Sequence, residues 1–104
     1  MNIYDQDLDI NAANFAALSP ISMMRRAASI YPDKSAVVYG ERRLSWGEVY
    51  KRCASVSVAL TRRGIGRGDT VAVLSANLPE MFEAHFAIPM SGAVLNAINM
   101  RLDA

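Results

Sequence analysis

The segment from Thr70 to Ser75 constrains the fold of this chain more than any other. It reads TVAVLS, so that in a strand Val71 and Val73 would face one side while Ala72 and Leu74 face the other. All four side chains are apolar, so both faces of the strand need a cover. This pattern is typical of a parallel sheet with helices on both sides, and it predicts an α/β fold.

The residues that follow complete a strand–helix–strand unit. We expect Asn77 to cap a helix in which Pro79 and Glu80 stand in the first turn. Pro89 and Gly92 should end this helix, because proline lacks a backbone N–H and glycine favours the left-handed stop. The apolar run 93–98 is then a second strand, parallel to the first.

No charged residue occurs between Ala84 and Met100. The stretch is too short for a membrane span, which takes about 20 apolar residues, and it contains His85, Pro89 and two asparagines. We therefore predict no membrane span and interpret the stretch as a helix and strand buried on all sides. The rest of a 104-residue chain cannot cover them. More of the same chain, or a second subunit, must do so.

The first half of the chain predicts a helix, a hairpin and a long helix. Residues 1–18 have no regular pattern and are expected to be an irregular leader; the first helix begins at Ser19-Pro20. Two short strands, 36–39 and 42–44, flank Gly40, which suits the first position of a type II′ turn. The motif S-x-x-E beginning at Ser45 is a capping box for a helix that ends before Gly64.

Charge and cysteine content exclude several functional classes. Eleven Lys and Arg against ten Asp and Glu give a net charge of +1, which argues against a nucleic-acid partner. The single cysteine excludes an internal disulfide and a cysteine-based zinc site. The first ten residues carry three acids and no basic stretch, unlike a secretory signal. We expect a reducing, cytoplasmic location.

Most chemically suggestive residues have an ordinary structural interpretation. The glycines of 64–68 follow a helix and precede a strand, which is the reverse of a dinucleotide-binding loop. His85 is the only histidine and is expected to be a satisfied core residue, and Cys53 a buried hydrophobe. The three arginine pairs at 25–26, 42–43 and 62–63 are expected to be solvated. No catalytic residue set, phosphate loop or metal-spaced cluster is present.

Asn99 and Arg101 are the best ligand candidates. They follow the second predicted strand, at its carboxyl end. In open α/β sheets, ligands bind outside this edge. The alternative is that Asn99 forms a turn and Arg101 is a surface charge.

The order of these pieces resembles a known family. Residues 19–103 resemble the N-terminal start of the adenylate-forming superfamily of acyl-CoA synthetases, luciferases and peptide-synthetase adenylation domains. The matching stretches are YPDKSAVVYGERRLSWGEVY at 31–50 and GIGRGDTVAVLSANLPEMFEAHFAIPMSGAVLNAINMRLDA at 64–104. The ending NAINMRLDA is most similar to fatty-acyl and medium-chain acyl-CoA synthetases.

The resemblance implies an ATP-dependent ligase that converts a carboxylate into an acyl-adenylate and then into an acyl-CoA. ATP, Mg²⁺ and CoA would be the cofactors of the parent enzyme. The family's phosphate loop, magnesium-binding glutamate and catalytic lysine would lie downstream, so residues 19–104 are expected to be an incomplete N-terminal portion that is inactive alone. For Asn99 and Arg101 the resemblance implies a role on the CoA side.

Two other interpretations remain open. A non-enzymatic module from a split or truncated gene could bind a partner, or form a homodimer, through the apolar stretch 84–100. A small nucleotide-binding α/β domain would instead bind ATP or NAD directly.

Overall fold

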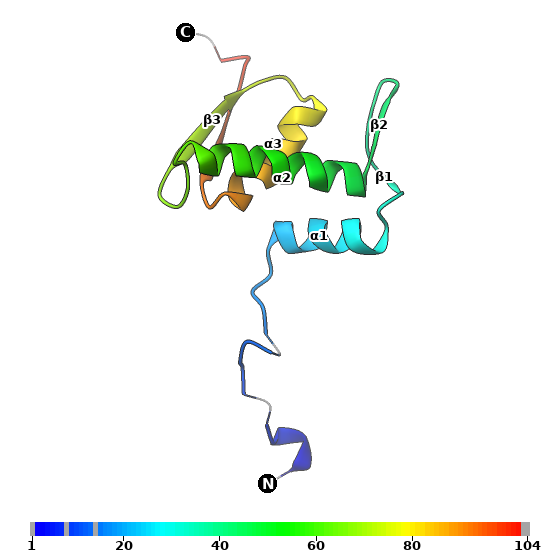
Figure 1. The fold of residues 1–104 in the computed structure, drawn as a ribbon, viewed down its shortest axis with the longest axis vertical. Coiled ribbons are helices and arrows are strands. Elements are labelled where there is room, and N and C mark those ends of the chain that lie inside the picture. The colour runs from blue at the N-terminus through cyan, green and yellow to red at the C-terminus, as the bar shows by residue number, and fades with distance from the viewer. Residues whose placement is uncertain (1, 8, 14, 103–104) are drawn as a thin grey trace.

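The computed structural model describes residues 2–7, 9–13 and 15–102 (Figure 1). The leader trails away from the folded body and contains a short 3-10 helix, η1 (Ile3–Asp5), where the side chain of Asn2 accepts a hydrogen bond from the N–H of Tyr4. The expectation of a wholly irregular leader overlooks this turn. The trailing leader also explains a radius of gyration of 17.7 Å, against about 13 Å for a compact chain of this length.

Helix α1 (Pro20–Ile30) forms as the sequence predicts. The hydroxyl of Ser19 accepts a hydrogen bond from the N–H of Ile21, and Pro20 occupies the first turn, where its missing N–H costs nothing. The helix ends at Tyr31, because the residue before a proline avoids the helical region.

A two-stranded hairpin follows, with β1 (Ser35–Tyr39) antiparallel to β2 (Arg42–Ser45). Gly40 has a φ of +59° and Glu41 keeps a negative φ, which is the sign pattern of the predicted type II′ turn. The pairing register of the two strands shifts between Ser35 and Val37.

Helix α2 (Trp46–Arg62) crosses the body and packs against α1 and α3. Its capping box is complete: Ser45 Oγ accepts from the N–H of Glu48 at 3.2 Å, and the Glu48 carboxylate accepts from the N–H of Ser45 at 2.8 Å. The left-handed Gly64, with φ of +78°, follows its end.

The predicted strand–helix–strand unit is present. Strands β3 (Thr70–Leu74) and β4 (Val94–Ile98) pair in parallel, with Thr70 opposite Val94, and α3 (Pro79–Met90) connects them. Pro89 lies in the last turn of α3, and the left-handed Gly92 lies just beyond its end. The α/β fold class is confirmed.

The start of α3 differs from the expectation. Its N-cap is Leu78, with no side-chain hydrogen bond, so Asn77 is not the cap. Pro79 takes the first helical position because its φ is fixed near the helical value, and this places Asn77 one residue too early to reach the free amides. The Asn77 side chain therefore makes no capping hydrogen bond at the start of α3.

The core lies where α1, α2 and α3 meet. Its buried members are Met24, Val49, Cys53 and Ala87, with Trp46 and the edge-to-face pair Phe82–Phe86 packed beside them. Only one face of the β3–β4 sheet is covered by α3. On the other face Leu74 is 66% and Val94 60% exposed, so the expected burial on all sides is not reached within the described residues.

Candidate functional site at the carboxyl edge of the sheet

A cavity of about 650 Å³ lies at the carboxyl ends of β3 and β4, against α3. This is within the range typical of small-molecule sites, and it occupies the edge where ligands of α/β proteins gather. Polar and apolar side chains share its wall. Its principal lining residues are Asn77, Met81, His85, Ile98, Asn99 and Arg101.

The structure brings Asn99 and Arg101 together on this wall. The side-chain oxygen of Asn99 accepts a hydrogen bond from the backbone N–H of Arg101 at 2.9 Å, so Asn99 builds the turn that follows β4. Arg101 is exposed at the cavity. The turn and ligand interpretations of Asn99 are therefore compatible, because the turn is what presents Arg101 to the cavity.

His85 is not the core residue that its apolar neighbours suggested. Its side chain is exposed and lines the cavity from α3. Nδ1 lies 2.7 Å from the carbonyl oxygen of Met81, one turn earlier. Since a carbonyl oxygen can only accept, Nδ1 carries a proton in this contact, and in the neutral ring Nε2 is then the acceptor. Sequence periodicity missed this position because α3 is apolar on nearly every side.

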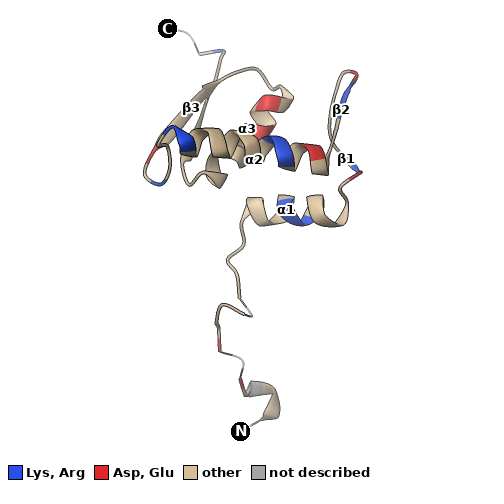
Figure 2. Cartoon of the chain, viewed as in Figure 1, with Lys and Arg blue, Asp and Glu red and all other residues tan. Residues whose placement is uncertain are grey.

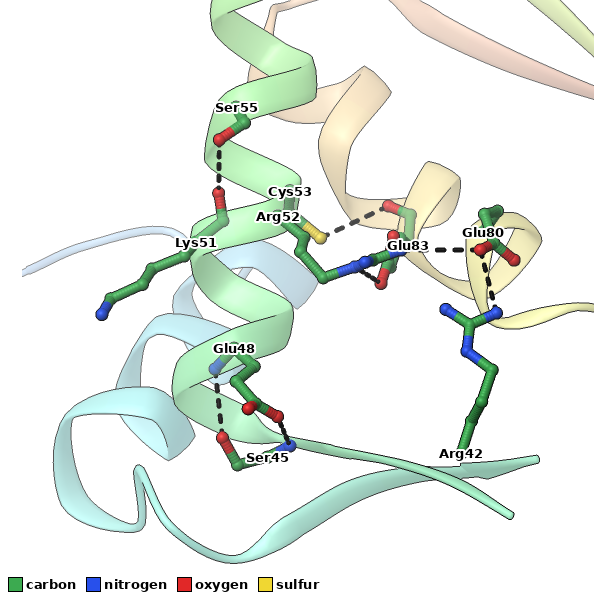
Figure 3. A network of polar contacts seen from close by, with 9 residues as sticks. All are labelled: Arg42, Ser45, Glu48, Lys51, Arg52, Cys53, Ser55, Glu80 and Glu83. Atoms are coloured by element: carbon green, nitrogen blue, oxygen red, sulfur yellow. Dashed lines mark hydrogen bonds and ion pairs between the residues drawn. The ribbon is translucent and has the colours of Figure 1, made fainter. Parts of the chain in front are cut away.

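An ion-pair network joins the hairpin, α2 and α3 (Figure 3). Arg42 contacts Glu80 at 3.0 Å, and Arg52 contacts Glu80 at 3.5 Å and Glu83 at 2.5 Å. Figure 2 shows charged residues on the hairpin, α2 and α3, and others on α1 and in the turn that follows α2. All three arginine pairs are exposed, as expected, and Arg42 is in addition paired with Glu80 from the start of α3.

The network changes the acid–base properties of its members. A hydrogen bond from its own backbone N–H, followed by the Arg42 guanidinium, holds the pKa of Glu80 below its ordinary value. The hydrogen bond to Glu83 raises the pKa of Arg52. Both shifts favour the charged forms, so the contacts stabilise the packing of the three elements and supply no general acid or base.

Cys53 is fully buried, as expected. Its Sγ donates a weak hydrogen bond to the carbonyl oxygen of Glu83 at 3.6 Å, and desolvation raises its pKa from 9.0 to about 11. A thiol of this kind is a poor nucleophile at neutral pH.

The glycine segment 64–68 is a helix-to-strand turn, as predicted. The N–H of Gly66 donates to the carboxylate of Asp69 at 2.9 Å, and the N–H of Asp69 returns to the carbonyl of Gly66 at 3.0 Å. These amides are occupied within the turn and are not available to a phosphate.

Within residues 2–7, 9–13 and 15–102 there is no group of His, Cys, Asp and Glu that could hold a metal ion. Among the helices in the same ranges, none is long and apolar enough to cross a membrane.

Comparison with known sequences gives a consistent result. The model of the AMP-binding enzyme family matches residues 24–104. The acetate–CoA ligase of Humulus lupulus is 47% identical over 98 residues, and the peroxisomal acetate/butyrate–CoA ligase of Arabidopsis thaliana is 46% identical over the same length. Each match covers 94% of this chain and 17% of the relative, so the chain spans about a sixth of their length.

Solved structures agree with this relationship. A Rhodopseudomonas palustris protein assigned to the long-chain-fatty-acid CoA ligases superposes with a TM-score of 0.78 and 34% identity, over 83% of this chain and 22% of that one. The O-succinylbenzoate CoA synthetase of Bacillus subtilis, solved with ATP and a magnesium ion, has a TM-score of 0.70 at 23% identity, over 77% of this chain and 22% of that one, and shows the fold alone. The match is to the N-terminal portion of such ligases. Its curated relatives named here are acyl-CoA ligases, and the chain belongs to the AMP-binding enzyme family.

Proposed function

We propose that this chain is the N-terminal scaffold of an ATP-dependent, AMP-forming acyl-CoA ligase and is inactive alone. The parent reaction joins a carboxylate to AMP from ATP, releasing pyrophosphate, and then transfers the acyl group to the CoA thiol with loss of AMP. The observation that carries the proposal is the 47% identity over nearly the whole chain but only a sixth of the relative.

The geometry supports a scaffold rather than a catalytic centre. Among the described residues of the cavity, the hydroxyl of Ser75 bonds to the Ala76 carbonyl oxygen and not to a base, and the one cysteine is buried with a raised pKa. The chain's own contribution would be structural: the capping box fixes α2, the ion-pair network fixes α3 to it, and α3 supports the two parallel strands.

The parent enzyme would use ATP, Mg²⁺ and CoA. Support comes from the family itself and from the similar fold solved with ATP and magnesium. For the carboxylate we propose a short aliphatic acid, since the relatives are named for acetate and butyrate. The sequence resemblance to medium-chain enzymes makes hexanoate and octanoate the next acids to test.

We assign the CoA side of the ligase to Asn99 and Arg101. The carboxyl-edge cavity supports this role, because Arg101 adds a positive charge to its lining, to which a phosphate could bind. For location, the peroxisomal relative from Arabidopsis does not favour the cytoplasm specifically, and a fluorescent fusion of the parent protein would decide between the two compartments.

A complementation assay tests the scaffold proposal. The chain would be co-expressed with the Humulus acetate–CoA ligase from which the matching N-terminal part has been removed, and thioester formation measured with ATP, Mg²⁺, CoA and acetate or butyrate. We expect turnover from the pair and none from either part. Turnover by the chain alone, or none from a stable complex of the two, would refute the proposal.

A non-enzymatic interaction module is the second candidate, favoured by the exposed apolar face at Leu74 and Val94. The mass of the chain in solution, measured by light scattering, tests it. Self-association, or a stable complex that leaves the truncated ligase inactive, supports the module. A cooperative, well-behaved monomer contradicts the module and weakens the scaffold proposal as well.

Calorimetric titration with ATP and NAD tests the nucleotide-binding alternative, for which we expect no heat.

A further inference from the structure

The lining of the carboxyl-edge cavity has three polar side chains that the proposed function has not used. One is Ser75, whose hydroxyl donates to the Ala76 carbonyl oxygen, and the others are His85 and Asn77. His85 enters it from α3, and Asn77 from the loop that precedes α3. Both were given other roles from sequence, His85 in the core and Asn77 at the helix cap, and the structure removes both roles.

The histidine ring is held in one orientation. Its Nδ1 lies 2.7 Å from the Met81 carbonyl oxygen, one helical turn earlier, and this contact favours the tautomer with the proton on Nδ1. Nε2 is then left as an acceptor on the cavity side, because His85 lines the cavity and Nδ1 is occupied. A neutral imidazole in this state recognises a donor, such as an amide N–H.

Asn77 adds a complementary group. Its side chain makes no hydrogen bond with any residue in the part of the chain that the structure describes, and its amide can both donate and accept. Met81 and Ile98 add apolar side chains to the same lining, which also includes Arg101. The lining therefore suits a ligand that carries amide, alkyl and phosphate groups.

We infer that His85 is a specificity-determining residue of this cavity: its Nε2 accepts a hydrogen bond from an amide N–H of the thiol substrate's pantetheine arm, and Asn77 makes a second contact to the same arm. The inference rests on the proposed function for the identity of the thiol substrate. It goes further by assigning two residues from α3 and its preceding loop.

The single histidine makes a direct measurement possible. In ¹⁵N NMR spectra of the labelled chain, at a pH where the ring is neutral, we expect the proton on Nδ1 and none on Nε2. Adding pantetheine should shift the Nε2 resonance and leave the tautomer unchanged. A proton on Nε2, or an unchanged resonance at saturating pantetheine, would overturn the inference. This test does not depend on enzymatic activity.

Kinetics of the complemented ligase provide the second test. His85→Leu should raise the KM for CoA about fivefold, since a neutral hydrogen bond contributes about 1 kcal/mol, while kcat and the KM for ATP stay the same. His85→Gln keeps an acceptor near the position of Nε2, so its KM should stay within about twofold of the original. Leu and Gln are both good helix formers, so a purely structural role would not separate them.

A matched asparagine pair completes the design. Asn77→Ala should raise the KM for CoA, and Asn96→Ala should not, because Asn96 lies in β4 and does not line the cavity. Equal effects of His85→Leu and His85→Gln, or no effect of either, would refute the inference. If the unsubstituted pair gives no turnover, the proposed function fails, and the NMR titration still decides the role of His85.

Discussion

At the scale of single residues, Glu83 is the position that most needs a charged partner, because its carboxylate is buried. Its side chain is about 95% buried, and Arg52 is its charged partner at 2.5 Å. A buried carboxylate without a partner would lose its hydration with nothing in return. The contact therefore ties α2 to α3 at the point where Cys53 also contacts the Glu83 backbone.

Arg52→Ala should lower the free energy of unfolding by about 1–2 kcal/mol, measured by urea denaturation. We expect the low end of the range for charged hydrogen bonds, because Arg52 itself is partly open to water. Arg26→Ala is the control, since Arg26 is exposed on α1 and has no ion pair within the described residues. Equal losses for both variants would show that the Arg52–Glu83 contact adds no stability.

Burial of Cys53 makes its chemistry depend on pH. A pKa raised from 9.0 to about 11 lowers the thiolate fraction at pH 8 by about a hundredfold. Iodoacetamide should therefore label the folded chain at least that much more slowly than the urea-unfolded chain. Rapid labelling of the folded chain at pH 8 would contradict the burial.

The same group affects stability in alkali. The folded-state pKa is raised, so the stabilising contribution is complete below about pH 9 and is lost as the pH rises toward 11. Cys53→Ala should remove this part of the alkaline loss, although it also leaves a small void in the core. The slope of unfolding free energy against pH, compared between the two proteins, separates the two effects.

The residue-level predictions failed where a side chain's environment is set by another element. The local sequence predicted Asn77 as the N-cap of α3. The N-cap is Leu78 instead, because the fixed φ of Pro79 makes that proline the first helical residue. His85 lies between apolar neighbours along the chain, yet the loop after β4, far away in sequence, opens a cavity beside it. The Arg42–Glu80 contact spans 38 positions, and no local pattern indicates it.

At the scale of elements, prediction succeeded because the signals are local. The capping box at Ser45 and the left-handed glycines at 40, 64 and 92 each act within a few residues. The order of helix, hairpin, long helix and strand–helix–strand follows from these signals. What local signals could not give is the packing of α2 across α3, which depends on contacts between distant segments.

The capping box gives the element-scale prediction. Ser45→Ala removes the acceptor for the Glu48 N–H and should destabilise the chain by about 1 kcal/mol in thermal or urea unfolding. Ser55→Ala is the matched control, because its hydroxyl bonds only to the Lys51 carbonyl within the same helix and should change stability by less than about 0.5 kcal/mol. A Ser45→Ala effect no larger than that of the control would mean that packing alone fixes the start of α2.

At the scale of the whole molecule, strand β3 is apolar on both faces, but only one of these faces is covered by other residues. In parallel register, Val71 and Val73 lie on the face that α3 covers, while Leu74 and Val94 lie on the open face. A two-stranded parallel sheet with one apolar face in water is unusual, because such sheets are normally covered on both sides. The sequence therefore predicted the need for a cover, which the remainder of the proposed ligase would supply.

This reasoning gives a prediction that separates folding from assembly. Leu74→Asp places a charge on the open face, where it meets water in the isolated chain and should change its unfolding free energy by less than about 0.5 kcal/mol. In the complemented ligase the same charge would be buried without a partner, so activity and complex formation should fall at least tenfold. Val38→Asp is the control, since Val38 is 56% exposed on the separate hairpin sheet and lies away from the open face of β3 and β4. If Leu74→Asp complements as well as Val38→Asp does, the open face is not where the rest of the enzyme packs.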